Sequence, residues 1–358
     1  MRVRRVFPIL AVGLFAAACA VSEAAPLATD GTPVPAAADP YRPAPFDGSR
    51  FSNLSGTQQR GLGSLLRWLL TRDDGEWPEA VSDPPAPKPV ERVERGLRVT
   101  FVGHATLLIQ VDGLNILTDP QWSANAGPVS WLGPKRVRPP AIPFDDLPPI
   151  DAVLVSHNHY DHLDRPTLER LVARFDPPVY TGLKVGEIIP SSRVTELDWW
   201  QSRPLGHGVR LTYVPAEHFS ARGPFDRNRT LWGGFVLETS MGPVYFAGDT
   251  GAGGHFALIR RRFGAPVLSM IPIGAYRPRW FMSPVHLDPA EALEASRTLE
   301  SGVSLGIHFG TFQLAEDSFG EPEKDLAAAL EATRAAGAEG PRMDFRIPAH
   351  GQPVEIFP

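Results

Sequence analysis

The sequence has a single cysteine, no run of like charges and no apolar run long enough to span a membrane. Its 358 residues include one cysteine, Cys19, so no disulfide can form within the chain, and core packing must stabilise the folded part. Runs of like charge are absent and the formal net charge is −5, which excludes the basic footprint of a nucleic-acid-binding protein. The apolar stretch over residues 6–18 is too short to span a bilayer comfortably, which argues against a membrane-spanning anchor.

The N-terminus is typical of an export signal. Arginines at positions 2, 4 and 5 precede the apolar stretch, which ends in Ala-Ala-Ala-Cys. Small residues directly before a cysteine resemble a bacterial lipobox, which predicts a signal peptide over residues 1–18 and an exported lipoprotein, anchored at Cys19 on the periplasmic side of the cell envelope. The alternative is an ordinary signal peptide, with Cys19 incidental. Residues 19–50 are rich in alanine and proline and are predicted to form a disordered tether.

The rest of the chain divides into a short extension and one large domain. Residues 51–96 are predicted to be an N-terminal extension that packs on the core, because leucines and Trp68 within residues 60–70 form a helical stripe. From residue 97 onward strands predominate at first, and Asp112-Gly113 indicates a hairpin between two of them. Further strands are expected at residues 152–155, 194–197, 209–214, 231–238, 243–247, 267–271, 303–307 and 343–347, and helices at 165–174, 255–263, 289–300 and 324–336. This order predicts two sheets with helices outside them.

The strongest chemical signal is the stretch from Ser156 to His162. It follows the apolar strand expected at 152–155 and contains His157, His159, Asp161 and His162. Histidine and carboxylate are zinc ligands, and these four donors are more than one tetrahedral ion can take from so short a loop. The loop therefore predicts two ions, with the first two histidines on one and Asp161 and His162 on the other. The alternative is a polar loop that is rich in histidine by chance.

Three more potential ligands follow the main loop in sequence order. His218 comes after the strand expected at 209–214, Asp249 after residues 244–248, and His308 after the strand at 303–307. Strand ends are rigid positions from which to project ligands, so a chance origin for all three is hard to sustain.

Residues 157–162 form the pattern H-x-H-x-D-H, which resembles the motif of the metallo-β-lactamase superfamily. The resemblance implies an α+β fold, the four-layer αββα sandwich, over residues 97–358. It also implies two Zn²⁺ ions, one held by His157, His159 and His218 and the other by Asp161, His162 and His308, with Asp249 bridging them. A hydroxide shared by such ions is expected to attack an electrophilic phosphorus or carbonyl group.

Further blocks resemble one family within that superfamily, the phospholipase D enzymes that hydrolyse N-acylphosphatidylethanolamine. They cover roughly residues 51–358 and include Gly-His-Ala-Thr at 103–106, Leu-Thr-Asp-Pro at 117–120, Leu-Asp-Trp-Trp at 197–200, Pro-Arg-Trp-Phe-Met at 278–282 and Ile-His-Phe-Gly-Thr-Phe at 307–312. The resemblance implies hydrolysis of a membrane phospholipid to N-acylethanolamine and phosphatidic acid.

The resemblance also implies site residues beyond the ligands. Tyr160 and His286 match positions that contact the phosphodiester, and His286 is interpreted as a phosphate-binding donor or an acid for the leaving alcohol. The alternative for His286 is a helix-entry histidine that packs against Pro289. The predicted catalytic residues are Asp161, Asp249 and His286.

Several assignments stay open at this point. Trp199, Trp200, Trp280 and Phe281 form either an apolar wall for acyl chains or ordinary core. His104 either supports the metal site or bonds nearby backbone, and Asp119 resembles a carboxylate that orients a metal-bound histidine.

Rival functions are a lactonase or other acyl hydrolase of the same fold, and a non-catalytic envelope lipoprotein that binds metal or lipid. The predicted partners are a membrane phospholipid substrate and, through the lipid anchor, the membrane surface. Nucleic acid is not expected, and a homodimer stays open.

Overall fold

The computed structural model describes residues 39–56, 60–336 and 344–357. The predicted signal peptide, Cys19 and most of the predicted tether lie outside these residues. The last part of that tether is packed on the domain: Ala44 is buried, and its amide donates a hydrogen bond to Asp198 (2.9 Å). The packed body therefore begins before residue 51, where the sequence analysis placed its boundary. Among the described helices, none is long and apolar enough to cross a membrane.

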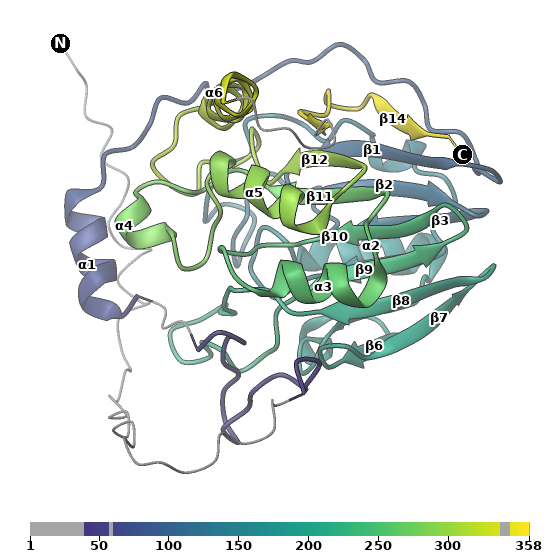
Figure 1. Cartoon of the computed structure of the whole chain (residues 1–358), viewed down its shortest axis with the longest axis horizontal. Coiled ribbons are helices and arrows are strands. Elements are labelled where there is room, and N and C mark those ends of the chain that lie inside the picture. The colour runs from purple at the N-terminus through teal and green to yellow at the C-terminus, as the bar shows by residue number, and fades with distance from the viewer. Residues whose placement is uncertain (1–38, 57–59, 337–343, 358) are drawn as a thin grey trace.

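Two seven-stranded sheets lie face to face, with helices on their outer faces (Figure 1). The first sheet has the order β14-β1-β2-β3-β4-β5-β6 and the second the order β13-β12-β11-β10-β9-β8-β7. The strands of the first sheet are β1 (Leu97–Gly103), β2 (Thr106–Val111), β3 (Leu114–Thr118), β4 (Ala152–Val155), β5 (Val179–Gly182), β6 (Val194–Leu197) and β14 (Pro353–Ile356). Those of the second are β7 (Ser202–Gly206), β8 (Val209–Val214), β9 (Gly234–Thr239), β10 (Gly242–Phe246), β11 (Leu268–Pro272), β12 (Val303–Ile307) and β13 (Phe345–Arg346).

The helices cover both outer faces and one end of the sandwich. They are α1 (Leu62–Thr71), α2 (Arg165–Phe175), α3 (His255–Phe263), α4 (Arg279–Met282), α5 (Pro289–Leu299) and α6 (Glu321–Ala335), with short 3₁₀ turns at Phe144–Asp146 and Gly186–Ile188. Leu168 and Leu171 of α2 join a core cluster with outward-facing side chains of the first sheet. Helices α3 and α5 lie over the second sheet, whereas α1 and α4 sit side by side beyond the strand ends (Figure 1). The four-layer α+β sandwich predicted from the sequence is confirmed.

Local sequence signals account for several boundaries. Asp112 and Gly113 both have positive φ (50° and 75°) between β2 and β3, the conformation that a two-residue hairpin turn requires. Helix α5 begins with a capping box, in which Asp288 accepts from the Glu291 amide and Glu291 accepts from the Asp288 amide. Pro289 occupies the first helical position, where its missing N–H costs nothing.

The central strands run parallel and are buried on both faces, which explains their continuous apolar sequences. Strand β4 pairs in parallel with β3 and β5, and β11 pairs in parallel with β10 and β12. All residues of β4 and β11 are buried. The carboxyl ends of parallel strands in a sheet share one edge, where loops can gather polar side chains.

Candidate metal centre

The candidate ligands come from loops that follow strands of both sheets. The loop with His157 to His162 leaves β4 of the first sheet, whereas His218, Asp249 and His308 follow β8, β10 and β12 of the second. Close backbone approach brings these loops together at Gly248, which has φ +60°. A Cβ there would lie 2.7 Å from Cβ of Ser156, so any side chain would push the two ligand loops apart.

The first group of ligands comprises His157, His159, His218 and Asp249. Nδ1 of His159 lies 2.8 Å from Nε2 of His157 and 3.2 Å from Nε2 of His218. Oδ2 of Asp249 lies 3.6 Å from Nε2 of His218 and 4.0 Å from Nε2 of His157. The three histidines are those that the resemblance assigned to the first ion, and Asp249 is the residue that it assigned to both ions.

Hydrogen bonds fix the tautomers of two of these histidines. Nδ1 of His218 donates to the carbonyl of Val285 (2.8 Å). Nδ1 of His157 lies 2.9 Å from Oγ of Ser156, whose own proton goes to Asp119 (2.6 Å), so His157 is the donor. Nε2 of both histidines therefore carries a lone pair, and both lone pairs converge on His159. A metal ion can accept both lone pairs at once, so the arrangement fits a metal-binding role.

The second group comprises Asp161, His162 and His308, together with His104. Nε2 of His162 and Nε2 of His308 each lie 3.3 Å from Oδ2 of Asp161. Nδ1 of His162 donates to Oδ2 of Asp119 (2.7 Å), which leaves Nε2 as the free ligand atom. Asp119 thus orients His162 directly and His157 through Ser156, the supporting role that the sequence predicted for it.

Asp249 lies between the two groups. Its Oδ2 is 3.2 Å from Nε2 of both His162 and His308, and it also approaches the first group. This position matches the predicted bridging role. The residues also fit metal ions by what they leave unsatisfied: among the described residues, Oδ1 of Asp249 is buried and has no hydrogen-bond partner.

Burial and the carboxylates set the charges of the histidines. Burial lowers the pKa of His159 and of His218 to about 3, and it lowers the pKa of His157 well below its usual value, so these three are neutral ligands. Burial also opposes a charge on His308, but Asp249 and Asp161 outweigh it and raise the pKa of His308 to about 9. Ions at the second position would therefore have to displace a proton from His308.

The chain matches the Beta-lactamase superfamily domain over residues 114–309. This range contains all seven predicted ligands. The chain belongs to the metallo-β-lactamase superfamily.

Relatives place it in one branch of that superfamily. An uncharacterized protein of Mycobacterium tuberculosis is 36% identical over 81% of this chain and 77% of its own length. The N-acyl-phosphatidylethanolamine-hydrolyzing phospholipase D 1 of Caenorhabditis elegans is 37% identical over 67% of this chain and 71% of its own length. The resemblance drawn from the sequence blocks is thereby confirmed.

Solved structures agree on the fold. The isothiocyanate hydrolase from Delia radicum gut bacteria covers 72% of this chain and 98% of its own length, with a TM-score of 0.56 and 19% identity. The metallo hydrolase Igni18 from Ignicoccus hospitalis covers 73% of this chain and 98% of its own, with a TM-score of 0.53 and 20% identity. Its family membership and the geometry of its ligand groups identify this chain as a metallo-hydrolase.

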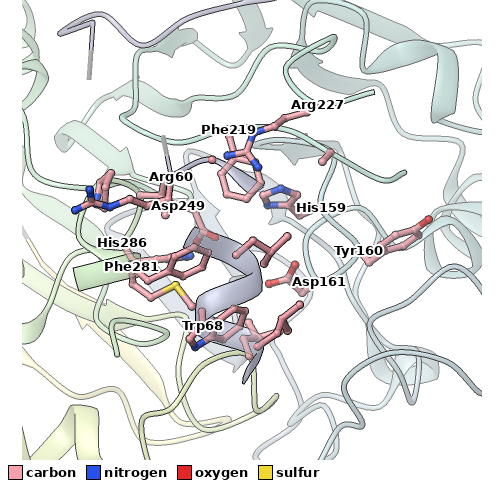
Figure 2. Close-up of a pocket in the computed structure, with 18 of the residues that line it drawn as sticks. Arg60, Trp68, His159, Tyr160, Asp161, Phe219, Arg227, Asp249, Phe281 and His286 are labelled. Carbon is pink, nitrogen blue, oxygen red and sulfur yellow. The ribbon is translucent and has the colours of Figure 1, made fainter. Parts of the chain in front are cut away.

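Four of the seven candidate ligands line a cavity of about 460 Å³: His159, Asp161, Asp249 and His308. His159, Asp161 and Asp249 face it, and Trp68 of α1 and Phe281 of α4 form part of its apolar wall (Figure 2). Their rings stack at 5.0 Å between centroids. The wall thus depends on the N-terminal extension, which also reaches the ligands: Oδ1 of Asn53 accepts from the His218 amide (3.0 Å).

Of the two roles left open for Trp199 and Trp200, an acyl-chain wall or ordinary core, the structure favours core. Trp199 and Trp200 are buried in the main core and do not line this cavity. Nε1 of Trp199 donates to the Trp232 carbonyl (2.8 Å). They follow β6 in a turn, so the sandwich core surrounds both of them. Of the other two aromatic candidates, Phe281 lines the cavity and Trp280 packs beside it.

The two predicted substrate contacts are placed differently. His286 lines the cavity, and its ring centroid lies 5.1 Å from that of His218. Tyr160 also lines it, but its hydroxyl donates to the carbonyl of Arg222 (2.9 Å) and points away from Asp161 (Figure 2).

Two arginines that sequence reasoning missed hold these segments. Arg222 donates to the carbonyls of Asn158 and Leu163, each at 2.9 Å, and so clasps the ligand loop. Arg279 donates to the His286 carbonyl (2.9 Å) and to Glu291 (2.6 Å). Arg279 lies in one of the sequence blocks that resemble the phospholipase family, and that resemblance could have marked it as a functional residue. No local sequence pattern marks Arg222.

Proposed function

We propose that this protein is a two-zinc phospholipase D that hydrolyses N-acylphosphatidylethanolamine-like lipids to N-acylethanolamine and phosphatidic acid. The observation that carries the proposal is the pair of ligand groups, joined through Asp249, at a cavity with an apolar wall. The named worm relative supports the substrate class. A lipid anchor at Cys19 and docking on the membrane surface belong to the same proposal.

When bound, the two ions would supply an activated hydroxide and positive charge near the scissile phosphodiester. The chain's own residues would then orient the substrate. Asp249 holds both ligand groups at a fixed separation, because one oxygen approaches four histidines. Asp119 and Ser156 keep His157 and His162 in one tautomer each.

His286 suits the role of a hydrogen-bond donor to phosphate better than that of an acid. Burial lowers the pKa of His286 to about 3, so the imidazole is neutral at physiological pH and still donates one N–H. Its Nδ1 is buried and has no hydrogen-bond partner within residues 39–56, 60–336 and 344–357. A phosphate oxygen would complete this group, and Arg279 holds the backbone that positions it.

The surroundings of the cavity suit a lipid. Leu65, Trp68 and Leu69 of α1 contribute apolar surface, and acyl chains are the matching ligand chemistry. Arg60, Arg72 and Arg227 also line the cavity and could face an anionic phosphodiester. A small lactone would leave much of this surface exposed to water.

The direct test uses mature protein with Cys19→Ser, incubated with N-acylphosphatidylethanolamine, phosphatidylethanolamine or a generic phosphodiester. Mass spectrometry would identify the products with and without a chelator. We expect chelator-sensitive release of N-acylethanolamine together with phosphatidic acid. If the protein binds two metal ions but cleaves none of these lipids, and instead opens acyl-homoserine or aliphatic lactones, the lactonase alternative replaces the proposal.

Exposed apolar side chains near the cavity lead to a prediction about membrane docking. Leu70 of α1 is 86% exposed and directly follows Leu69, which lines the cavity. Trp131 is 77% exposed in the loop that follows Ala126, another lining residue. Insertion of both side chains into a membrane would contribute about 2 kcal/mol each. The double variant Leu70→Glu with Trp131→Glu should therefore cleave vesicle substrate at least about tenfold more slowly.

The control substrate is a short-chain, water-soluble analogue, which the double variant should cleave within about twofold of the wild-type rate. Phe357→Glu is the matched control, since Phe357 is 71% exposed but lies beside the end of β14 and not at the cavity. Equal losses on vesicles and on the soluble analogue would count against docking through these residues.

A further inference from the structure

His104 is a buried histidine that the predicted ligand set leaves out. It stands at the tip of the hairpin between β1 and β2, in the first sheet, and is 1% exposed. Its side chain and its backbone both contact residues of the second ligand group.

The side chain of His104 contacts Asp161. Nε2 lies 2.8 Å from Oδ2 of Asp161, and a carboxylate can only accept, so Nε2 carries the proton. Nδ1 is buried and has no hydrogen-bond partner among the described residues. The hydrogen bond to Asp161 is therefore the polar contact that the imidazole makes, and it fixes the carboxylate from the first-sheet side.

The backbone and ring of His104 contact His308. The His308 amide donates to the His104 carbonyl (2.8 Å), and the two ring centroids lie 4.1 Å apart. Both residues have left-handed backbones, with φ of 58° for His104 and 62° for His308. Non-glycine residues rarely adopt this conformation, and where they do the surrounding structure has to impose it.

These contacts join the two sheets at the second ligand group. Asp161 follows β4 of the first sheet, whereas His308 directly follows β12 of the second. The first group has separate supports: Ser156 orients His157, and the Val285 carbonyl orients His218. His104 accordingly groups by distance with Asp161, His162 and His308.

We propose that His104 is a positioning residue for the second metal ion, which holds Asp161 and His308 at ligating distance across the junction of the two sheets. This inference rests on the two-ion centre of the proposed function. It predicts an asymmetry that the ligand set alone does not: loss of the His104 hydrogen bond should weaken the second ion and spare the first.

The test compares two variants by metal binding. His104→Leu keeps much of the side-chain volume but has no donor, whereas His104→Gln retains an N–H that can reach Asp161. Zinc affinity would be measured by competition with a fluorescent chelator, and stoichiometry by elemental analysis after dialysis. We expect His104→Leu to weaken the second ion by roughly 10- to 100-fold, with the first ion changed by less than about threefold. His104→Gln should restore most of the difference.

His350→Leu is the matched control, because His350 is also largely buried but contacts Asp83 (3.2 Å) and not the ligand groups. It should bind both ions like the wild type. Circular dichroism of the metal-free proteins would check that each variant folds.

The possible outcomes separate the inference from the proposed function. If His104→Leu binds both ions with wild-type affinity, or loses both equally, the inference is overturned. A wild-type protein that binds no second ion would instead contradict the two-ion centre itself. Selective loss of the second ion, with rescue by glutamine, supports the inference whatever lipid is cleaved.

Discussion

Asp249→Asn is expected to abolish turnover while leaving the fold intact. One oxygen of Asp249 approaches histidines of both ligand groups, at 3.2–4.0 Å. A neutral amide of the same shape cannot offset the charge of two cations, so the second ion should be held weakly and the hydroxide poorly positioned. The expected fall in kcat is on the order of 10³-fold or more, measured on N-acylphosphatidylethanolamine with saturating zinc.

Asp151→Asn provides the matched control. Asp151 is likewise a paired carboxylate, although only partly buried, and it precedes β4 and bonds Arg92 (2.6 Å) at the opposite end of the strand from the ligand loop. This change should lower stability by about 1 kcal/mol and leave kcat within about twofold. Turnover by Asp249→Asn that comes within tenfold of the wild type would rule out the bridging role.

Removal of metal is expected to lower the melting temperature by on the order of 10 °C. Metal bound at about 1,000 times its dissociation constant contributes about 4 kcal/mol, and each kcal/mol shifts the melting of a domain of this size by about 2–4 °C. Without cations, the lone pairs of His157 and His218 converge on His159, and Oδ1 of Asp249 stays buried with no partner in the described part of the chain. Differential scanning calorimetry with and without chelator would measure the shift.

Two controls accompany that experiment. Chelator saturated with zinc beforehand should leave the melting temperature unchanged, and added zinc should restore it in the stripped protein. If elemental analysis shows complete removal of metal but the melting temperature does not fall, the buried cluster is stable without cations and the ligand assignment is wrong.

Some elements were predictable because their signals are local. The apolar run before Ser156 predicted β4 at Ala152–Val155, and β6, β8 and β12 were also predicted with the bounds found. The helix expected at 289–300 is α5, which begins at Pro289 through the cap at Asp288. In each case the residues that determine the element lie within or beside it, so short-range chemistry was sufficient.

Other elements were missed because their determinants lie far away in the chain. Strand β14, near the C-terminus, pairs with β1 and was not expected. Segment 39–50 was assigned to the tether from its composition, yet Ala44 bonds Asp198, a partner 154 residues away. The short helix α4 forms where Phe281 stacks on Trp68. A long-range contact of this kind leaves no periodic pattern in the segment itself.

The sequence by itself determined the ligand types, their order and their attachment to strand ends. A local apolar run predicts a buried parallel strand, and the polar residues directly after it predict the loop that carries the ligands. Only the tertiary structure decided which tryptophans face the cavity, that Arg222 clasps the ligand loop, and that His104 joins Asp161 to His308. These contacts link residues 57 or more positions apart, or lie on opposite sheets, so their geometry exists only once the two sheets pack together.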